Sequence, residues 1–246
     1  MTELQQNLKN LRLGGMAANL PVRCQEAKSH ELDYPDFLGN LIGDELSRRQ
    51  DNLLNRRTKL ARLPYLKTID EFDFDFNPAI KKKDIMALAS SAFIFKSQNI
   101  LFVGPPGVGK SHLAIGLGIC AIHNGYTVLY RSAFDLVAEM VEADLNKTRK
   151  TYLQQLVRAN LLIIDELGMK KMPPSTADDL LEVIHRRHLN GSTIIATNRI
   201  VSDWAAILGD NAATAAILDR FLENSAIFTI RGKSFRLAKN NGKEES

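Results

Sequence analysis

Residues 104–111 read Gly-Pro-Pro-Gly-Val-Gly-Lys-Ser, and this octet decides the fold. It matches the pattern GxxxxGK[ST] at every fixed position, between a short apolar run (99–103) and an apolar helical run (112–122). A strand, a glycine loop and a helix in this order bring backbone N–H groups and a helix N-terminus together around a phosphate group. The sequence therefore predicts a nucleoside triphosphate site, and the alternative is a glycine loop that binds no ligand.

Each part of the phosphate loop (residues 104–111) has an expected role. Its glycines let the backbone turn tightly and approach phosphate oxygens. Lys110 is long enough to reach the β- and γ-phosphates, and the Ser111 hydroxyl is a suitable ligand for Mg²⁺. We expect the nucleotide to contact Gly104, Pro105, Pro106, Gly107, Val108, Gly109, Lys110, Ser111 and His112.

A second motif follows the apolar run 161–164, which ends in Asp165 and Glu166. Open α/β sheets bind ligands at the carboxyl ends of their strands, where this acidic pair is expected to lie. Asp165 is predicted to coordinate Mg²⁺ directly or through water, and Glu166 to polarise the attacking water as general base. The added glutamate favours hydrolysis over binding alone. The alternative is a pair of acids that ends a strand at the surface.

Two later residues are candidates for the same site. Asn198 follows the apolar run 192–197 and is placed to hydrogen-bond the γ-phosphate or the attacking water, or else is a turn residue. Arg220 lies on a predicted helix, where it pairs with Asp219 or faces solvent. The other interpretation is an arginine finger that enters a neighbouring subunit's site and stabilises the transition state.

From residue 80 onward, strand and helix patterns alternate, which predicts an α/β fold with a mostly parallel sheet covered by helices on both faces. The predicted strands are 99–103, 127–131, 161–164, 192–197 and 227–230. The predicted helices are 112–122, one capped by Ser132, 148–160, 176–189 and 212–223. The acidic segment 68–78 is expected to be a linker that enters this domain.

The first part of the chain shows helical periodicity and no strand signal, which predicts a small all-helical domain. Its first helix is expected to stop at Gly14-Gly15, its second to cover 16–31, and its third to begin at a cap, Asp36, and end near Pro64. The predicted domains are therefore a helical basic domain (1–67), an ATPase domain (68–238) and a disordered tail (239–246).

The composition is that of a soluble globular protein, with 246 residues, 45% hydrophobic and 24% charged. Because no apolar stretch approaches the ~18 residues that span a bilayer and the N-terminus lacks a signal-peptide core, we expect a cytoplasmic protein with no membrane partner. Cys24 and Cys120 form no CxxC pair, which argues against a zinc site and a disulfide framework.

Positive charge is concentrated in residues 46–67, where seven Lys and Arg residues face one acid, Asp51. Such a run is either a solvated helix face or a surface that contacts DNA phosphates without reading bases. The candidate DNA contacts are Arg48, Arg49, Arg56, Arg57, Lys59 and Arg62. Further cations that are candidates for lining a channel are Lys81, Lys82, Lys83, Lys147, Arg149, Lys150, Arg186 and Arg187.

Taken together, these motifs resemble an AAA+ ATPase, and more closely the IstB-like transposition helpers of the DnaC/IstB branch. The resemblance covers most of the chain. Its specific marks are the stretches 34–38, 45–49, 62–68 and 72–74, together with 164–168, 191–194, 197–199, 218–220 and the late run Arg231-Gly232-Lys233-Ser234-Phe235-Arg236. A GTPase is less well matched, since the segment 198–201 lacks the aspartate of the Asn/Thr-Lys-x-Asp motif that recognises guanine. A small-molecule kinase is also less well matched, because no lid insertion is visible between the strands.

The resemblance implies that Lys110 and Ser111 are Walker A residues, that Asp165 and Glu166 form Walker B, that Asn198 is the sensor and that Arg220 is a finger acting in trans. It also implies ATP and Mg²⁺ as cofactors, and homo-oligomers on double-stranded DNA with ATP sites at subunit interfaces. The implied partner is a cognate transposase, which the protein assists in selecting and capturing target DNA. A C-terminal helical lid is not expected. The alternatives are a replicative helicase loader of the DnaC type and a slowly hydrolysing, nucleotide-gated scaffold.

Overall fold

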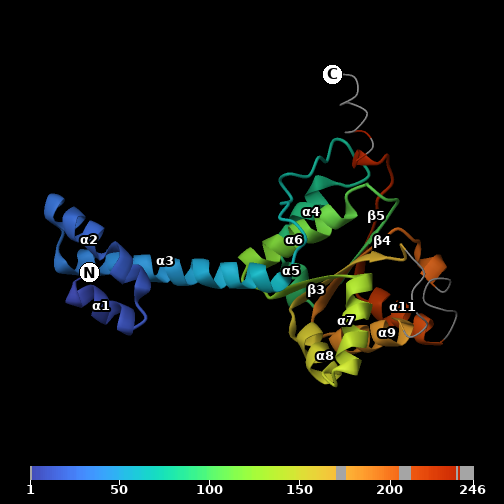
Figure 1. Ribbon diagram of the computed structural model, residues 1–246. Coiled ribbons are helices and arrows are strands. Elements are labelled where there is room, and N and C mark those ends of the chain that lie inside the picture. The colour runs from blue at the N-terminus through green and yellow to red at the C-terminus, as the bar shows by residue number, and fades with distance from the viewer. Residues whose placement is uncertain (1, 170–175, 205–211, 237, 239–246) are drawn as a thin grey trace. The chain divides into compact units, whose positions relative to one another are not determined.

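The computed structural model describes residues 2–169, 176–204, 212–236 and 238, and divides the chain into two compact units, 1–57 and 58–246. The sequence predicts this boundary later, after residue 67. Residues 239–246, predicted to be a disordered tail, lie outside the described residues. Figure 1 shows the helices and strands of both units.

The first unit consists of α1 (Glu3–Asn10), α2 (Gly14–Ser29) and most of α3 (Tyr34–Ala61). Thr2 and Gln5 form a capping box at the start of α1. The predicted cap Asp36 is wrong, because the Asp33 carboxylate accepts the Asp36 N–H at 2.9 Å and α3 begins directly after Asp33.

Gly14 and Gly15 do not separate two helices as predicted, because both lie in the first turn of α2. Glu45 of α3 explains this. Its Oε2 accepts the Gly15 N–H at 2.6 Å and thereby caps the N-terminus of α2. A Cβ at Gly15 would lie 2.7 Å from the Asp44 carbonyl oxygen, so glycine permits the close approach of α2 and α3.

In the second unit, five parallel strands form one sheet in the order β2-β3-β4-β1-β5. The strands are β1 (Asn99–Val103), β2 (Val128–Ser132), β3 (Leu161–Leu167), β4 (Ser192–Thr197) and β5 (Ser225–Thr229). The five predicted strands are thus confirmed, with small shifts at the ends of β2, β3 and β5.

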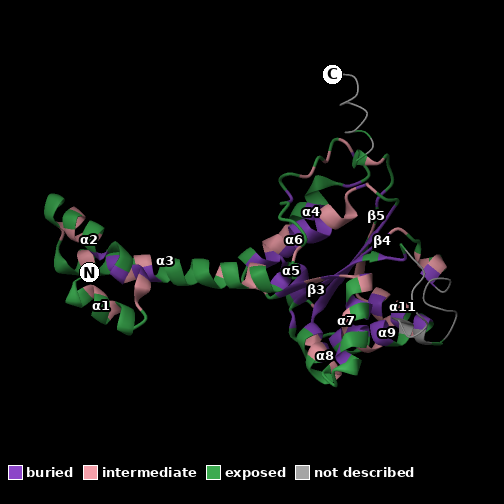
Figure 2. Ribbon diagram, viewed as in Figure 1, coloured by how far each residue is buried: buried purple, intermediate pink, exposed green. Residues whose placement is uncertain are grey.

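Helices cover both faces of this sheet (Figure 1). Before β1 lie α4 (Lys82–Ala89) and α5 (Ala92–Phe95), which the sequence analysis did not assign, and after it comes α6 (Lys110–His123). The remaining helices are α7 (Ala133–Leu145), α8 (Arg149–Arg158), α9 (Thr176–Arg187), the 3-10 turn η1 (Val201–Asp203) and α11 (Ala212–Leu222). The strands β1, β3 and β4 are almost entirely buried between the helix layers (Figure 2), whereas the residues of the edge strand β5 are half-buried or exposed.

One cluster of the core lies between the sheet and the layer formed by α7, α8, α9 and α11, and includes Leu162, Ile164, Ile195, Trp204 and Phe221. Ser132 caps α7 as predicted, since its hydroxyl accepts the Asp135 N–H at 3.0 Å. No described helix is both long and apolar enough to cross a membrane.

Candidate functional site

The phosphate loop joins β1 to α6, as the sequence predicts. Gly107 and Gly109 have φ angles of +83° and +102°, in the region that side chains other than glycine rarely adopt. Lys110 then begins α6, so the helix N-terminus points at the loop. This is the backbone geometry that cradles phosphate groups.

Two segments distant in sequence pack closely against the loop. In the predicted linker (residues 68–78), a ring carbon of Phe72 lies 2.4 Å from where a Gly109 Cβ would be. In the C-terminal segment (residues 230–236), the Ser234 Oγ lies 2.1 Å from a Gly107 Cβ position, and the Phe235 N–H donates to the Gly107 carbonyl at 3.0 Å. The predicted linker therefore forms a wall of the site.

These segments and the loop enclose a cavity of about 340 Å³. Aromatic rings from both segments meet beside it, with Phe76 and Phe235 at a centroid distance of 5.0 Å and Phe72 at 5.3 Å from His112. Polar groups face it as well. The lining comprises Tyr65, Lys67, Glu71, Phe72, Asp73, Phe76, Asn77, Gly107, Val108, Gly109, Lys110, Ser111, His112, Phe235 and Arg236. An apolar wall beside a phosphate loop is suited to a nucleotide with a flat base.

The Lys110 ammonium is held by the loop itself. Its Nζ donates to the carbonyl oxygens of Gly104 and Pro105, each at 2.8 Å. Burial lowers the pKa of Lys110, and the nearby charge of Asp165 partly offsets this effect. A partly desolvated positive charge therefore lies at the loop within the electrostatic influence of Asp165, and phosphate groups are its expected partners.

Asp165 and Glu166 have different surroundings. Asp165 is buried, with its Oδ1 accepting the Glu166 N–H at 2.8 Å and its Oδ2 accepting the Tyr130 hydroxyl at 3.0 Å. Burial, followed by the negative charge of Asp165, raises the pKa of Tyr130, so that this hydroxyl remains a donor at neutral pH.

A β-bulge exposes Glu166. Ile164 and Leu167 pair with Ile195 and Thr197, so two residues of β3 face one residue of β4. Glu166 has a φ of +60°, a strained value for a residue other than glycine. The bulge turns the Glu166 side chain towards solvent while Asp165 stays buried, and this difference suits the separate roles predicted for the two carboxylates.

The sheet order brings Asn198 to the same edge. Thr197, which precedes it, pairs with Val103 at the start of the phosphate loop and with Leu167 beside the acidic pair. The Asn198 Oδ1 is buried and has no hydrogen-bond partner in the described part of the chain. A buried acceptor without a partner is costly, so this atom is suited to accept a hydrogen bond from a water molecule or a ligand.

Arg220 is not among the residues that line the nucleotide cavity. It lies on α11, where its guanidinium contacts the His185 imidazole of α9. Pairing with Asp219, one of the alternatives for Arg220, is not observed among the described contacts. A residue that acts in a neighbouring subunit's site does not need to line the cavity of its own chain, and the position of Arg220 is compatible with that role.

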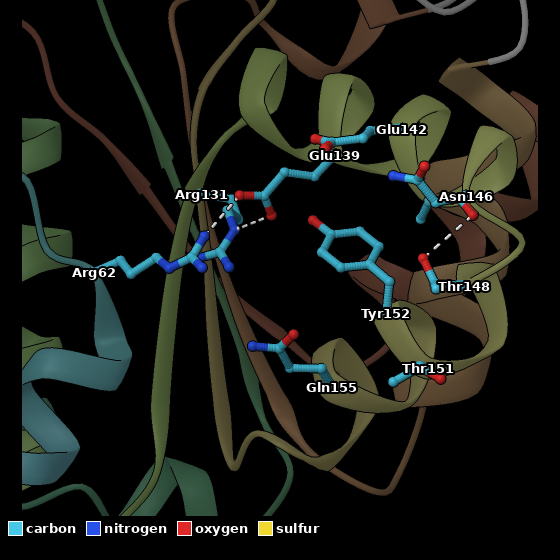
Figure 3. Close-up of a pocket in the computed structure, with 10 residues that line it drawn as sticks. Arg62, Arg131, Glu139, Glu142, Asn146, Thr148, Thr151, Tyr152 and Gln155 are labelled. Carbon is cyan, nitrogen blue, oxygen red and sulfur yellow. Dashed lines mark hydrogen bonds and ion pairs between the residues drawn. The ribbon is translucent and has the colours of Figure 1, made fainter.

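The candidate DNA contacts lie on α3 and the turn that follows it. Arg49 forms an ion pair with Glu45 at 2.7 Å, and Arg62 forms one with Glu139 at 2.9 Å (Figure 3). Arg48 lies against Gly14. Arg56 and Lys59 are exposed and Arg57 is half-buried, in the stretch of α3 that Figure 2 shows as largely exposed.

Arg187 was wrongly grouped with the channel-lining cations. It is 1% exposed, and its guanidinium donates to the carbonyl oxygens of Leu156 and Ala159, each at 2.7 Å. Burial lowers its pKa to about 10. Arg187 thus ties α9 to the end of α8. Arg149 is likewise engaged by three acids, Asp144, Asp179 and Glu182.

The donor set at the site fits Mg²⁺ bound together with a nucleotide. Within the described ranges, no group of three or more His, Cys, Asp or Glu side chains is placed to hold a metal ion. Ser111 and Asp165 supply a hydroxyl and a buried carboxylate. Since Mg²⁺ usually takes one or two protein ligands plus phosphate oxygens and water, this incomplete set is the expected one.

Sequence reasoning missed several residues of the site. Phe72, Phe76, Phe235 and Arg236 line the cavity, and Tyr130 binds Asp165. The alternating aromatics of segment 68–78 and the run 231–236 were visible as motifs, but not their contacts with the loop. Nothing in the local sequence marks Tyr130, because its role depends on the pairing of β2 with β3.

A family model described as "IstB-like ATP binding protein" matches residues 6–243. The chain belongs to this family. One relative, named as an ATP-binding protein of insertion sequence IS5376 from Geobacillus stearothermophilus, is 38% identical to this IstB-like chain. The match covers 96% of this chain and 94% of the relative. A second relative, named for ATP binding in insertion sequence IS21 of Pseudomonas aeruginosa, is 37% identical. The match covers 96% of this chain and 89% of the relative.

Solved structures share the fold of the IstB-like chain at low identity. DnaI matches with a TM-score of 0.57 and 16% identity, covering 70% of this chain and 93% of that one. The DnaC helicase loader matches with a TM-score of 0.52 and 18% identity, covering 71% of this chain and 98% of the loader. AMPPCP-bound DnaA from Aquifex aeolicus matches with a TM-score of 0.56 and 22% identity, and the match spans 74% of this chain and 56% of DnaA. The second unit is therefore an AAA+ P-loop fold, and the family is one of insertion-sequence ATP-binding proteins. Among the residues described after β5, no helical lid follows.

Proposed function

We propose that this protein is an ATP-dependent, double-stranded DNA-binding ATPase that assists a transposase in selecting and capturing target DNA. The observation that carries the proposal is the meeting of four groups at one sheet edge, namely the phosphate loop, the buried Asp165, the exposed Glu166 and the unpartnered Asn198 Oδ1. Relatives named for insertion sequences support the link to transposition.

In this proposal, the chain's own residues divide the work of hydrolysis. The loop amides and Lys110 bind the phosphates, which would replace the Gly104 and Pro105 carbonyls as partners of the Lys110 ammonium. Glu166 and Asn198 orient the attacking water. Ser111 and Asp165 would hold Mg²⁺, whose charge balances that of the phosphates. Arg236, at the cavity wall, adds positive charge on the same side.

We further propose that active sites are completed between subunits. Arg220 lies outside its own cavity and would supply a positive charge to the site of a neighbouring copy. The exposed cations of α3 would contact DNA phosphates without reading sequence. ATP binding would assemble the oligomer on DNA, and hydrolysis would release it. Within this proposal the protein acts in the cytoplasm.

The experiment measures binding to duplex DNA with and without ATP, for the wild type, Glu166→Gln and Lys110→Ala. We expect binding only with ATP for the wild type, persistent complexes for Glu166→Gln because hydrolysis is blocked, and none for Lys110→Ala. Equal binding in all conditions would exclude an ATP-controlled DNA clamp.

A replicative helicase loader is the alternative that the fold favours, given the match to DnaC. A loader would grip a helicase and leave duplex DNA binding insensitive to the arginines of α3. A slowly hydrolysing scaffold is a further alternative, and it predicts the same ATPase rate for the wild type and Glu166→Gln.

A further inference from the structure

Tyr130 lies on β2 and reaches the acidic motif across the sheet. Tyr130 pairs with Ile163 and Ser132 with Asp165 in the parallel register of β2 and β3. Because side chains alternate along a strand, Tyr130, Ile163 and Asp165 lie on the same face of the sheet. The Tyr130 hydroxyl donates to the Asp165 Oδ2 at 3.0 Å.

The two hydrogen bonds to Asp165 fix its carboxylate. Oδ2 accepts from Tyr130, and Oδ1 accepts from the Glu166 N–H at 2.8 Å. Each carboxylate oxygen has two lone pairs, so each keeps one for another partner. With 3% of its surface exposed, Asp165 also has little room to turn. The carboxylate is therefore held in one orientation with acceptor capacity still open.

Tyr130 itself is anchored from the opposite face of the sheet. The buried Arg131 donates from Nη1 to the Tyr130 carbonyl at 2.6 Å and from Nε to Glu139 at 2.6 Å. Figure 3 shows this guanidinium and Glu139 beside a cavity of about 330 Å³ between β2, α7 and α8. The network holds the backbone of Tyr130 while its hydroxyl holds Asp165.

We propose that Tyr130 is a positioning residue that orients Asp165 for Mg²⁺ bound with the nucleotide. The inference rests on the proposed function, in which Asp165 contributes to a Mg²⁺–ATP site. Partners of metal ligands commonly change metal affinity 10- to 100-fold when they are removed, because they fix the ligand's orientation. The rival explanation is that Tyr130 only satisfies a buried carboxylate.

The test measures the affinity of a fluorescent, non-hydrolysable ATP analogue in Mg²⁺ and in EDTA. The ratio of the two dissociation constants reports how strongly Mg²⁺ and nucleotide binding are coupled, independently of activity. The variants are Tyr130→Phe and, as the positive control, Asp165→Asn. The matched control is Tyr126→Phe, since Tyr126 is also half-buried and lies before β2, outside the network that Arg131 and Glu139 form beside Tyr130.

We expect Tyr130→Phe to lower the ratio by about tenfold, through weaker binding in Mg²⁺ and unchanged binding in EDTA. Tyr126→Phe should keep the wild-type ratio. If Tyr130→Phe keeps the wild-type ratio, or weakens binding equally in Mg²⁺ and EDTA, the positioning role is wrong. If Tyr130→Phe does not fold, Tyr130→His, which retains a donor, should preserve more of the coupling than Tyr130→Leu, and equal loss in both overturns the proposal. A wild type that binds no nucleotide would instead refute the proposed function.

Discussion

At Lys110, a half-buried ammonium group is bound by two carbonyl oxygens of its own loop. Burial favours its neutral form, so the folded protein without nucleotide bears a cost for keeping the charge there. Phosphate oxygens would remove that cost. The position of Lys110 therefore favours the binding of an anionic ligand more than it favours the stability of the folded chain.

This arrangement predicts the behaviour of Lys110→Ala. Without ATP, its melting temperature should stay within a few degrees of the wild type, since the lost hydrogen bonds are offset by the removal of a desolvated charge. At an ATP concentration of about 100 times Kd, the wild type should gain on the order of 5–10 °C and the variant nothing. Thermal-shift measurements with and without Mg²⁺–ATP test the expected melting temperature in each condition. A large loss of stability without ATP would mean that Lys110 is mainly structural.

At the residue scale, the sequence predicted the groups that lie within motifs, such as Lys110 and Asp165. It missed Tyr130 and Phe72, because their roles depend on contacts between distant segments. The exposure of Glu166 was also beyond local reasoning, since it depends on how β3 bulges against β4.

Among the elements, α2 depends on a residue of another helix. Leu13, at its start, makes no side-chain cap, and the Glu45 carboxylate of α3 takes over that role. The pKa of Glu45 is lowered, first by the Arg49 guanidinium and also by the Gly15 and Met16 amides. A lowered carboxyl pKa stabilises the folded state above the ordinary value of 4.5, and this contribution disappears as the pH falls through the folded value.

We therefore expect Glu45→Gln to loosen the start of α2 at pH 7, and this difference from the wild type to shrink as the pH falls through the lowered pKa of the wild-type carboxyl. Hydrogen–deuterium exchange of peptides covering residues 13–20 measures this, with variant and wild type compared at each pH. Asp51→Asn, an exposed acid on the same helix, is the control and should change nothing. The same loosening at every pH down to the acid unfolding of the protein would show that the charge of Glu45 is unimportant.

At the element scale, the five strands and most helices followed from apolar runs, caps and glycines. The start of α2 and the cap of α3 did not. Gly14-Gly15 is typical of a helix end, but here it permits α2 to approach α3 closely. The short helices α4 and α5 carry too little periodicity for assignment.

For the whole molecule, charge decides how DNA would be bound. Replacing both Arg56 and Arg57 with glutamine should weaken duplex binding on any sequence and reduce the slope of log K against log salt by about 1–2, because fewer counterions are released. The control replaces Lys28 and Lys96 with glutamine, which removes the same charge from exposed positions elsewhere. Filter binding or anisotropy across a salt series measures both. If the two double variants behave alike, net charge matters and the position on α3 does not.

The contact between Gly107 and Ser234 has a consequence for exchanging parts among relatives. The phosphate loop and the C-terminal segment are far apart in sequence, yet one fills the space that the other leaves open. A chimera that grafts residues 104–111 from one family member onto another would inherit a mismatched surface unless residues 230–236 moved with it. The two segments should therefore be inherited as a unit, although recombination along the gene can readily separate them.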